Sequence, residues 1–375
     1  MQVTVHRSIN EIEPLQWDSI VGTDRIIFSH ACLKAIEASG INDCRFFYLA
    51  FWRDNGEIAA HVPVYSIPTD LLIFSNRKIK NLINFIRKRK PFFLQPRFLE
   101  CGSPACLGQP FSLREGVMFS DIVELLSHTL DSIAISEGIR FILLRDFLPA
   151  ELTTFRHIKN YRFYAIENLP NTELEIRWQS YDDYVASMRS RYRYKLKRQE
   201  QLWERAGFKS ELHHYFSTYA EELAQQWKNV NINAKEYNRE QINSDFYRNL
   251  DLDLELRCRV LAIIKGSELV AHAFLIFDDN VLRWLYFGRK HVAQRDNVYL
   301  FTASQVIKLA IEEKLSILEM GITNYTVKLE LGAKIVPLFM FLRFRGPLLA
   351  YLLPRLHQLF NSPPKIEPAN VFKKV

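Results

Sequence analysis

The residues best able to do chemistry lie close together near the end of the chain, in the segment LEMGITNYTVKLELGA. The spacing predicts a short strand over Ser316–Met320 that stops at Gly321, and Tyr325, Lys328 and Gly332 follow it. Side chains just beyond the end of a strand often line a crevice. A lysine there is either a cation exposed to solvent or a group that meets a ligand, and its spacing alone favours the exposed cation.

A second candidate is the basic segment Tyr184–Ala206, whose apolar residues Met188, Tyr192 and Leu196 recur every four positions and predict a helix. Six cations surround these apolar residues: Arg189, Arg191, Arg193, Lys195, Lys197 and Arg198. So many like charges repel one another unless an anion lies near, and arginines bind phosphate through paired hydrogen bonds. The pattern fits a phosphate-rich ligand, a solvated helix face, or a nucleic acid stacked on Tyr192, Tyr194 and Trp203.

A third candidate is the segment Arg77–Arg97, which carries eight Lys and Arg residues and no acidic residue. Its apolar residues follow the spacing of one helix face: Ile79, Leu82, Ile83 and Ile86. A basic amphipathic helix of this kind touches an anionic membrane or a partner through residues 77–90, or packs on its own domain with its cations in solvent.

The stretch Gly346–Phe360 is also amphipathic, but Pro354 and Arg355 interrupt its apolar residues. It is too short to span a bilayer. We expect it to pack across a domain junction or to touch a membrane surface.

The elements that must position these residues occur twice. The segments Cys44–Ile67 and Cys258–Phe277 each read as strand, glycine turn and strand, and EIAAH in the first matches ELVAH in the second. In both halves a helical stretch then runs into an apolar strand: Asp121–Glu137 before IRFILLRDF, and Tyr299–Lys314 before LSILEMGIT. We therefore expect a mixed α/β (α+β) protein with two copies of one unit, each a mixed, mostly antiparallel sheet flanked by helices.

The repeat also predicts the domains. The first is expected over residues 1–170, the second over residues 171–345, and an amphipathic tail over residues 346–375. His61 and His272 lie 211 residues apart, whereas Phe141 and Ile317 lie 176 apart, so the first copy holds 35 additional residues between hairpin and helix. This insertion is placed at about residues 70–103.

Composition limits the class of protein. The chain has 375 residues, 48% of them hydrophobic, and a formal net charge of +7, as in a globular protein that favours anionic partners. Its five cysteines form no even disulfide set and no CxxC metal pair, so we expect buried thiols. No signal peptide, spanning helix or metal site is predicted. The expected location is the cytoplasm, either free or peripheral to the inner membrane.

Several further motifs follow one another in a specific order: Trp17, FSHACLKAIEASG, EIAAHVPVY and CGSP, then YDDYVASMRSRYRYKLKRQEQLWERAG, YFG, Tyr299-Leu300 and MGITNYTVKLELGA. From about Ile9 to Phe344, this order resembles the FemAB-like, peptidoglycan-biosynthesis branch of the GNAT acyltransferases. The resemblance implies a tandem GNAT fold that transfers an acyl or aminoacyl group from a thioester or a tRNA ester to an amine.

The resemblance also implies roles for single residues. Lys328 matches a lysine thought to offset charge on the tetrahedral intermediate, and Tyr286 and Tyr299 match aromatic positions of the acyl channel. The candidate proton acceptors for the amine are Tyr325, Tyr286 and Glu319. The expected catalytic residues are thus Lys328, Tyr325 and Tyr286. The expected substrate-binding residues are Arg193, Lys197, Arg198, Tyr299, Gly288 and Gly332.

Two departures from the family pattern bear on the substrates. The segment FGRKHVAQRDNVYL has a single glycine, so the glycine-rich pyrophosphate loop of CoA-dependent GNAT enzymes is not evident, and the long helical arm of tRNA-dependent peptidoglycan enzymes is missing from the sequence. The donor is expected to be acyl-CoA, an acyl carrier protein or aminoacyl-tRNA, with nucleic acid a partner only in the last case. The acceptor is expected to be an amine of a small molecule or envelope precursor. The alternative is a non-catalytic binder of an anionic ligand, RNA or membrane on a degenerate GNAT fold.

Overall fold

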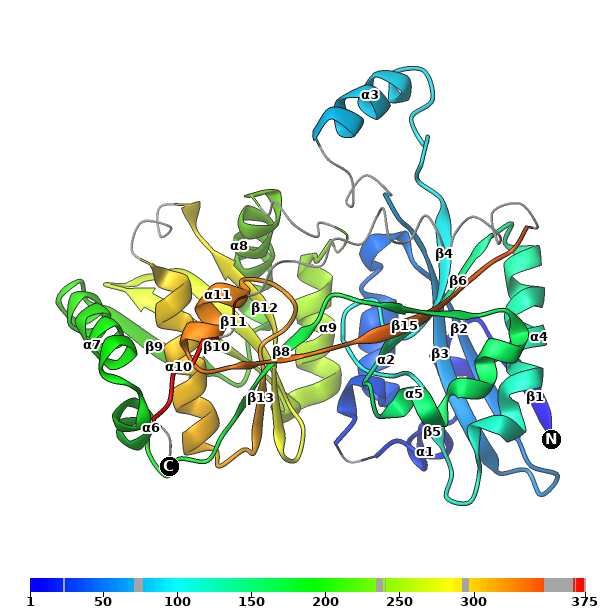
Figure 1. Ribbon diagram of the computed structural model, residues 1–375, viewed down its shortest axis with the longest axis horizontal. Helices are drawn as coiled ribbons and strands as arrows, with labels where there is room; N and C mark the ends of the chain where they lie inside the picture. Colours follow the sequence, from blue (N-terminus) through cyan, green and yellow to red (C-terminus); the bar gives the residue numbers. More distant parts are fainter. Residues whose placement is uncertain are drawn as a thin grey trace.

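The computed structural model describes residues 1–22, 24–70, 77–233, 239, 241–291, 297–346, 367 and 369–373. Two β-sheets lie side by side in these residues, each with helices packed beside it (Figure 1). Both sheets are mixed, and each contains one parallel pair of strands among antiparallel ones. The expected fold class is therefore confirmed.

The first sheet has eight strands in the order β1-β2-β3-β4-β6-β15-β7, with β5 paired to β3. Its parallel pair is β4 and β6. The strands are β1 (Gln2–His6), β2 (Arg45–Trp52), β3 (Ile58–Pro68), β4 (Arg97–Cys101), β5 (Ser112–Leu113), β6 (Phe141–Phe147), β7 (Tyr164–Glu167) and β15 (Phe339–Phe344).

The second sheet has seven strands in the order β14-β8-β13-β12-β11-β10-β9. Its parallel pair is β12 and β13. The strands are β8 (Asn171–Glu175), β9 (Phe208–His213), β10 (Cys258–Lys265), β11 (Glu268–Phe277), β12 (Val281–Arg289), β13 (Ile317–Glu319) and β14 (Lys334–Val336).

The helices connect the strands and cover the sheets (Figure 1). They are α1 (Pro14–Asp18), α2 (His30–Ala38), α3 (Arg77–Arg87), α4 (Phe119–Ser136), α5 (Glu151–Thr154), α6 (Tyr181–Ser187), α7 (Ser190–Arg205), α8 (Ala220–Asn233), α9 (Ser244–Leu254), α10 (Val298–Glu312) and α11 (Tyr325–Glu330).

The internal repeat is present in the structure. The hairpin β2–β3 turns at Gly56 with φ of 83°, and the hairpin β10–β11 turns at Gly266 with φ of 66°, a backbone region that glycine adopts without strain. In the first half α4 leads into β6, and in the second half α10 leads into β13. Both β6 and β13 then pair in parallel with a neighbouring strand, as the shared order of elements predicts.

Three boundaries differ from the sequence prediction. The strand β4 lies inside the expected insertion of residues 70–103, where its mostly buried residues pair with β3 and β6 in the first sheet. The strand β15 lies inside the range 171–345 expected for the second domain, yet it pairs with β6 and β7 of the first sheet. The helix expected over Tyr184–Ala206 is two helices, because the backbone at Met188 and Arg189 bonds to the chain end at Val371 and Phe372 instead.

Each half has its own apolar core, and a further cluster of buried apolar residues spans both halves and fixes their relative position. Helix α2 of the first half packs against α9 of the second, and Lys34 forms an ion pair with Asp253 at 2.8 Å. Buried residues of both halves, among them Phe28, Cys106 and Tyr286, belong to this shared cluster. A cavity at the junction therefore has walls that are held in place from both sides.

The cysteines behave as expected. All five thiols are free, and all except the half-buried Cys44 are buried. The amphipathic stretch Gly346–Phe360 falls, after Gly346, outside the described residues. No helix in the described part of the chain is both long enough and apolar enough to cross a membrane.

Candidate active site

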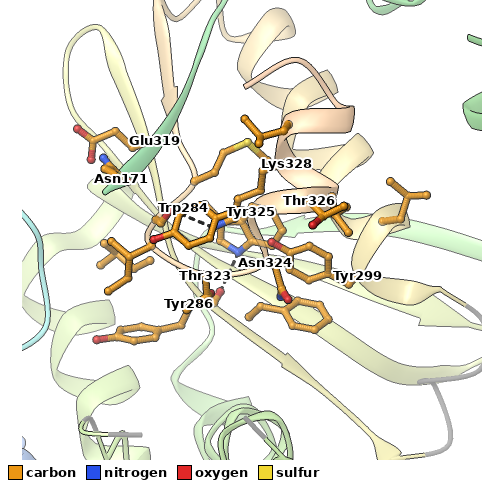
Figure 2. A pocket seen from close by; sticks show the side chains of 18 of the residues that line it. Asn171, Trp284, Tyr286, Tyr299, Glu319, Thr323, Asn324, Tyr325, Thr326 and Lys328 are labelled. Carbon is orange, nitrogen blue, oxygen red and sulfur yellow. Dashed lines mark hydrogen bonds between the residues drawn. The ribbon is translucent and has the colours of Figure 1, made fainter. Parts of the chain in front are cut away.

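A cavity of about 1210 Å³ lies at the junction of the two halves. The first half contributes residues 105–107 and Arg145, while β12, β13, α10 and α11 of the second half form most of the wall. Figure 2 shows side chains from these second-half elements gathered around one opening, with Asn171 from β8 beside them. The segment that the sequence singled out for chemistry is thus part of the largest wall of the cavity.

Lys328 is placed by a sharp turn between β13 and α11. The chain turns at Gly321 with φ of 80°, and α11 begins four residues later, so its last turn points the lysine back toward the end of β13. The Lys328 Nζ donates a hydrogen bond of 3.0 Å to the Gly321 carbonyl oxygen, which also accepts one of 2.6 Å from the Thr172 hydroxyl. The side chain is 1% exposed. Lys328 is therefore a buried group of the cavity wall.

The electrostatic state of Lys328 is unusual for a lysine. Burial disfavours the ammonium form and lowers the pKa of Lys328 to about 7. Among the described residues no carboxylate forms an ion pair with this ammonium, and its hydrogen bond goes to a neutral carbonyl. An anion that entered the cavity would supply the missing countercharge.

Three tyrosines predicted for the site also line the cavity. The Tyr286 hydroxyl donates to the Ala105 carbonyl at 3.0 Å and so ties the second sheet to the first half. The Tyr325 hydroxyl donates to the Pro170 carbonyl at 2.9 Å. Tyr299 stacks on Trp284 with ring centroids 5.4 Å apart, and burial raises its pKa. These rings make the wall beside Lys328 largely aromatic (Figure 2).

Glu319 brings a carboxylate to the same wall. Arg283 donates to it at 2.5 Å and to Asp278 at 2.6 Å, so one guanidinium serves two carboxylates. Burial raises the pKa of Glu319, and the Arg283 guanidinium opposes that rise. Asp278 also accepts a hydrogen bond of 2.9 Å from the backbone N–H of Ile26, which joins this network to the first half.

The basic helix α7 reaches the cavity only at its start. Arg191 and Tyr192 line the cavity, whereas Arg193, Lys197 and Arg198 lie outside the lining. Arg193 donates to the carbonyls of Ala186 and Met188 at 3.2 Å and so closes the end of α6, and Lys197 and Arg198 are exposed. The three cations expected to clamp a phosphate therefore do not line this cavity, and their role in binding stays a prediction.

Gly288 and Gly332 also lie outside the cavity lining, where their missing side chains make room for neighbours. A Cβ on Gly288 would lie 2.2 Å from the imidazole of His272, and one on Gly332 would lie 2.2 Å from the ring of Phe372. Both glycines therefore allow close packing, and neither belongs to the cavity lining in which contact with substrate was expected.

Several lining residues were not singled out from the sequence. Arg145 lies 176 residues before Gly321, which is the spacing between the two copies of the repeat. The repeat could therefore have pointed to Arg145, because Gly321 lies in the segment already selected for chemistry. Its guanidinium contacts Glu100 at 3.3 Å and Asp146 at 3.5 Å, and Arg239 is a second partner of Glu100. No spacing pattern in the sequence singles out Arg289 as a lining residue.

The charged side chains of the cavity lining that lack an ion-pair partner are mostly cations. Among the lining residues that the structure describes, Lys328, Arg191 and Arg289 have no carboxylate partner, while Glu330 pairs with Lys195 at 2.5 Å and the exposed Glu367 adds one carboxylate. Burial lowers the pKa of Arg289. Among the described residues, no group of three or more His, Cys, Asp or Glu side chains is arranged so that it could hold a metal ion.

Solved structures with the same arrangement define the class. The chain superposes on FemX with a TM-score of 0.57 at 11% identity, covering 96% of this chain and 100% of FemX. The C-terminal domain of a putative lysylphosphatidylglycerol synthetase from Agrobacterium fabrum gives 0.53 at 11% identity, covering 96% and 100%. A tandem GNAT protein from the clavulanic acid biosynthesis pathway gives 0.50 at 9% identity, covering 92% and 99%. The protein therefore has the tandem GNAT fold.

Within this class the chain belongs to the FemAB-like family, described as peptidoglycan biosynthesis/recognition, whose model matches residues 103–334. A curated relative, the putative 8-amino-7-oxononanoate synthase 2 of Mycobacterium tuberculosis strain H37Rv, is 27% identical over 317 residues. The match covers 83% of this chain and 41% of the relative, so the chain spans about two fifths of the relative's length. The family expected from the order of motifs is confirmed.

Proposed function

We propose that the protein is a transferase that passes an acyl or aminoacyl group from an activated thioester or ester to the amine of a cell-envelope precursor. The observation that carries this proposal is the Lys328 ammonium, buried in a cavity wall without a carboxylate partner among the described residues. Membership of the FemAB-like family and the tandem GNAT fold support the class of reaction.

In the proposed reaction the amine nitrogen attacks the carbonyl carbon of the donor, and the carbonyl oxygen becomes an anion. Lys328, held by the Gly321 carbonyl, stabilises this oxyanion, and a donor of that kind contributes most inside a cavity that excludes water. Collapse of the tetrahedral intermediate breaks the bond to the donor sulfur or oxygen, which takes up a proton and leaves. The amine proton passes to a base, and no bond to the protein forms.

Glu319 is the base that fits best among the three candidates. The hydroxyl hydrogens of Tyr286 and Tyr325 are directed to main-chain carbonyls, and a phenol is a poor proton acceptor at neutral pH. Glu319 presents a carboxylate whose raised pKa makes it a stronger base than an ordinary glutamate. Its ion pair with Arg283 keeps it ionised before the reaction.

The substitution Glu319→Gln is expected to lower kcat on the order of 10²-fold, because the amide cannot accept the amine proton. The carboxylate form is active, so the wild-type rate rises with pH through the pKa of Glu319, and this acidic limb of the pH–rate profile is expected to disappear in the variant. Glu330→Gln is the matched control, since Glu330 lines the same cavity but pairs with Lys195. An equal loss in both variants would remove Glu319 from this role.

The cavity is large enough to hold donor and acceptor together. Its volume of about 1210 Å³ is above the roughly 300–1,000 Å³ typical of single-ligand sites. Arg191 and Arg289 on its wall favour a substrate that carries phosphate or carboxylate groups. The donor remains one of three: acyl-CoA, an acyl carrier protein or aminoacyl-tRNA. The name of the curated relative refers to an amino compound, so small amines belong beside envelope precursors among the acceptors to be tested.

The proposal is tested in two stages. Mass spectrometry of ligands that co-purify with the protein is expected to show a bound acyl donor or a nucleotide-linked sugar. Purified protein is then mixed with each class of radiolabelled donor and with the candidate amines, and one pair is expected to yield an amide product that requires both substrates.

The competing function is a non-catalytic binder of anions on the same fold. The exposed cations Lys197 and Arg198 and the 70% exposed Tyr194 on α7 favour RNA as its ligand. RNA binding with a steep salt dependence, together with no turnover for any donor, would establish this function in place of transfer.

A further inference from the structure

The insertion between β3 and β4 forms an arm that the repeated fold does not require. The arm comprises the described residues 77–96, with α3 followed by a turn, and it extends away from the first sheet (Figure 1). The second half connects β11 directly to β12 without such an element. From residue 71 to residue 99 the sequence contains no acidic residue. The repeated fold therefore does not account for the presence of this arm.

Several apolar side chains of the arm are exposed to solvent. Phe85 is 70% exposed, Phe92 is 82% exposed, Phe93 is 36% exposed and Leu94 is 37% exposed. Single exposed apolar residues are common on protein surfaces, but four within ten positions mark a site that another surface covers.

Three exposed cations lie between Phe85 and Phe92 in the sequence. Lys88, Arg89 and Lys90 are exposed, and none of them pairs with a carboxylate among the described residues. A surface that combines exposed aromatic rings with unpaired cations matches the interface of an anionic bilayer, where the rings enter the headgroup region and the cations meet phosphates.

Hydrogen bonds of Arg87 hold the arm in shape. Both terminal nitrogens of Arg87 donate to Asp70, at 2.8 and 2.7 Å, and its Nε donates to the Phe93 carbonyl at 2.9 Å. This arginine links the base of the arm, the end of α3 and the turn. The Phe92–Leu94 segment is thus presented by an ordered turn and needs little further ordering when it meets a surface.

We infer that the arm docks the protein onto an anionic phospholipid bilayer, with Phe92, Phe93 and Leu94 in the headgroup region and Lys88, Arg89 and Lys90 against lipid phosphates. A second copy of the chain is a poorer occupant, because two arms without acidic residues repel each other. RNA is also a poorer occupant, since Leu94 and the neighbouring Pro91 gain nothing from a phosphate backbone. The docking is independent of the proposed transfer and holds whether or not the protein is an enzyme.

Flotation of the full chain with vesicles tests this inference. The protein is expected to float with vesicles of phosphatidylcholine and phosphatidylglycerol, to bind pure phosphatidylcholine much more weakly, and to be released by salt. Two variants are each expected to lower the partition coefficient by about tenfold or more: Phe92→Ser with Phe93→Ser, and Lys88→Gln with Arg89→Gln and Lys90→Gln. All substituted side chains are exposed, so unchanged melting curves are expected.

Matched controls separate docking from general charge attraction. Replacing Lys197, Arg198 and Arg205 by Gln removes three exposed cations from α7, and Leu252→Ser removes a 70% exposed leucine from α9. Both controls are expected to bind vesicles like the wild type. Equal loss in the α7 variant, or capture of RNA or an acidic protein without any binding to anionic vesicles, would overturn the inference.

Insertion itself has a separate readout. In Phe92→Trp the new indole is expected to be quenched by lipids brominated on their acyl chains, whereas the indole in Leu252→Trp is expected to be unaffected. Flotation without quenching at position 92 would contradict insertion of the arm.

Discussion

Lys328→Met is expected to reduce the rate of transfer about 10²–10³-fold and, at the same time, to stabilise the folded protein. The loss of rate follows from removing the ammonium that is held at Gly321 in the cavity wall, since a single oxyanion donor is worth that much in acyl transfer. The gain in stability follows from burial, because an ammonium that is 1% exposed without a carboxylate partner among the described residues costs folding free energy. A site that works at the expense of stability is the expected signature of a functional residue.

The stabilisation by Lys328→Met has a defined pH dependence. The pKa of Lys328 is about 7 in the folded protein and 10.5 as an ordinary lysine. Between these values the unfolded chain binds a proton that the folded protein does not, so wild-type stability rises with pH from about 7 to 10.5. The free energy of unfolding of the variant is expected to exceed that of the wild type by about 1–3 kcal/mol, a value that allows for loss of the hydrogen bond to Gly321. This difference is greatest at pH 7 and below and becomes smaller in alkaline solution.

Denaturant unfolding at pH 6 and pH 9 measures this effect, and the transfer assay measures the rate. In the wild type, kcat/KM is expected to fall as pH rises above about 7, since the free enzyme loses the Lys328 proton, and this limb should be absent in the variant. Lys334→Met is the control, because Lys334 is exposed and pairs with Glu175. A variant with full activity and unchanged stability would show that Lys328 has no role in the site.

Gly288→Ala is expected to destabilise the protein by about 2–4 kcal/mol, without a specific effect on substrate affinity. The new Cβ would lie 2.2 Å from His272 and 2.8 Å from the backbone nitrogen of Trp227, and neither can move easily. His272 is fully buried and held by the Tyr247 hydroxyl at 3.1 Å and by the Gln226 side chain at 2.9 Å. Burial lowers the pKa of His272 to about 3, so the imidazole is neutral in the folded protein at neutral pH.

Thermal and denaturant unfolding of Gly288→Ala, beside KM for the donor, distinguish a packing role from a binding role. Gly266→Ala is the control, because its Cβ meets open space and only the φ of 66° is strained, which costs about 1 kcal/mol. Normal stability with a raised KM would instead place Gly288 in contact with substrate.

The repeated architecture was accessible from the sequence because its signals are local. Each hairpin is an apolar run, a glycine turn and a second apolar run, and each crossover helix ends directly before an apolar strand. The pairing of β15 with the first sheet could not be predicted from the sequence, because an apolar strand has the same pattern whichever sheet it joins. The break between α6 and α7 depends on Val371, which lies far away in the sequence.

The amino-acid sequence by itself determined the repeated hairpins and crossover helices, their order, the family and the segment that carries Lys328, because backbone hydrogen bonding and apolar periodicity act between near neighbours. Only the tertiary structure decided that Lys328 is buried rather than exposed, that Arg191 lines the cavity while Lys197 and Arg198 do not, and that Gly288 makes room for His272. The physical reason is that the environment of a charge or a missing side chain is set by groups that distant parts of the chain bring to it.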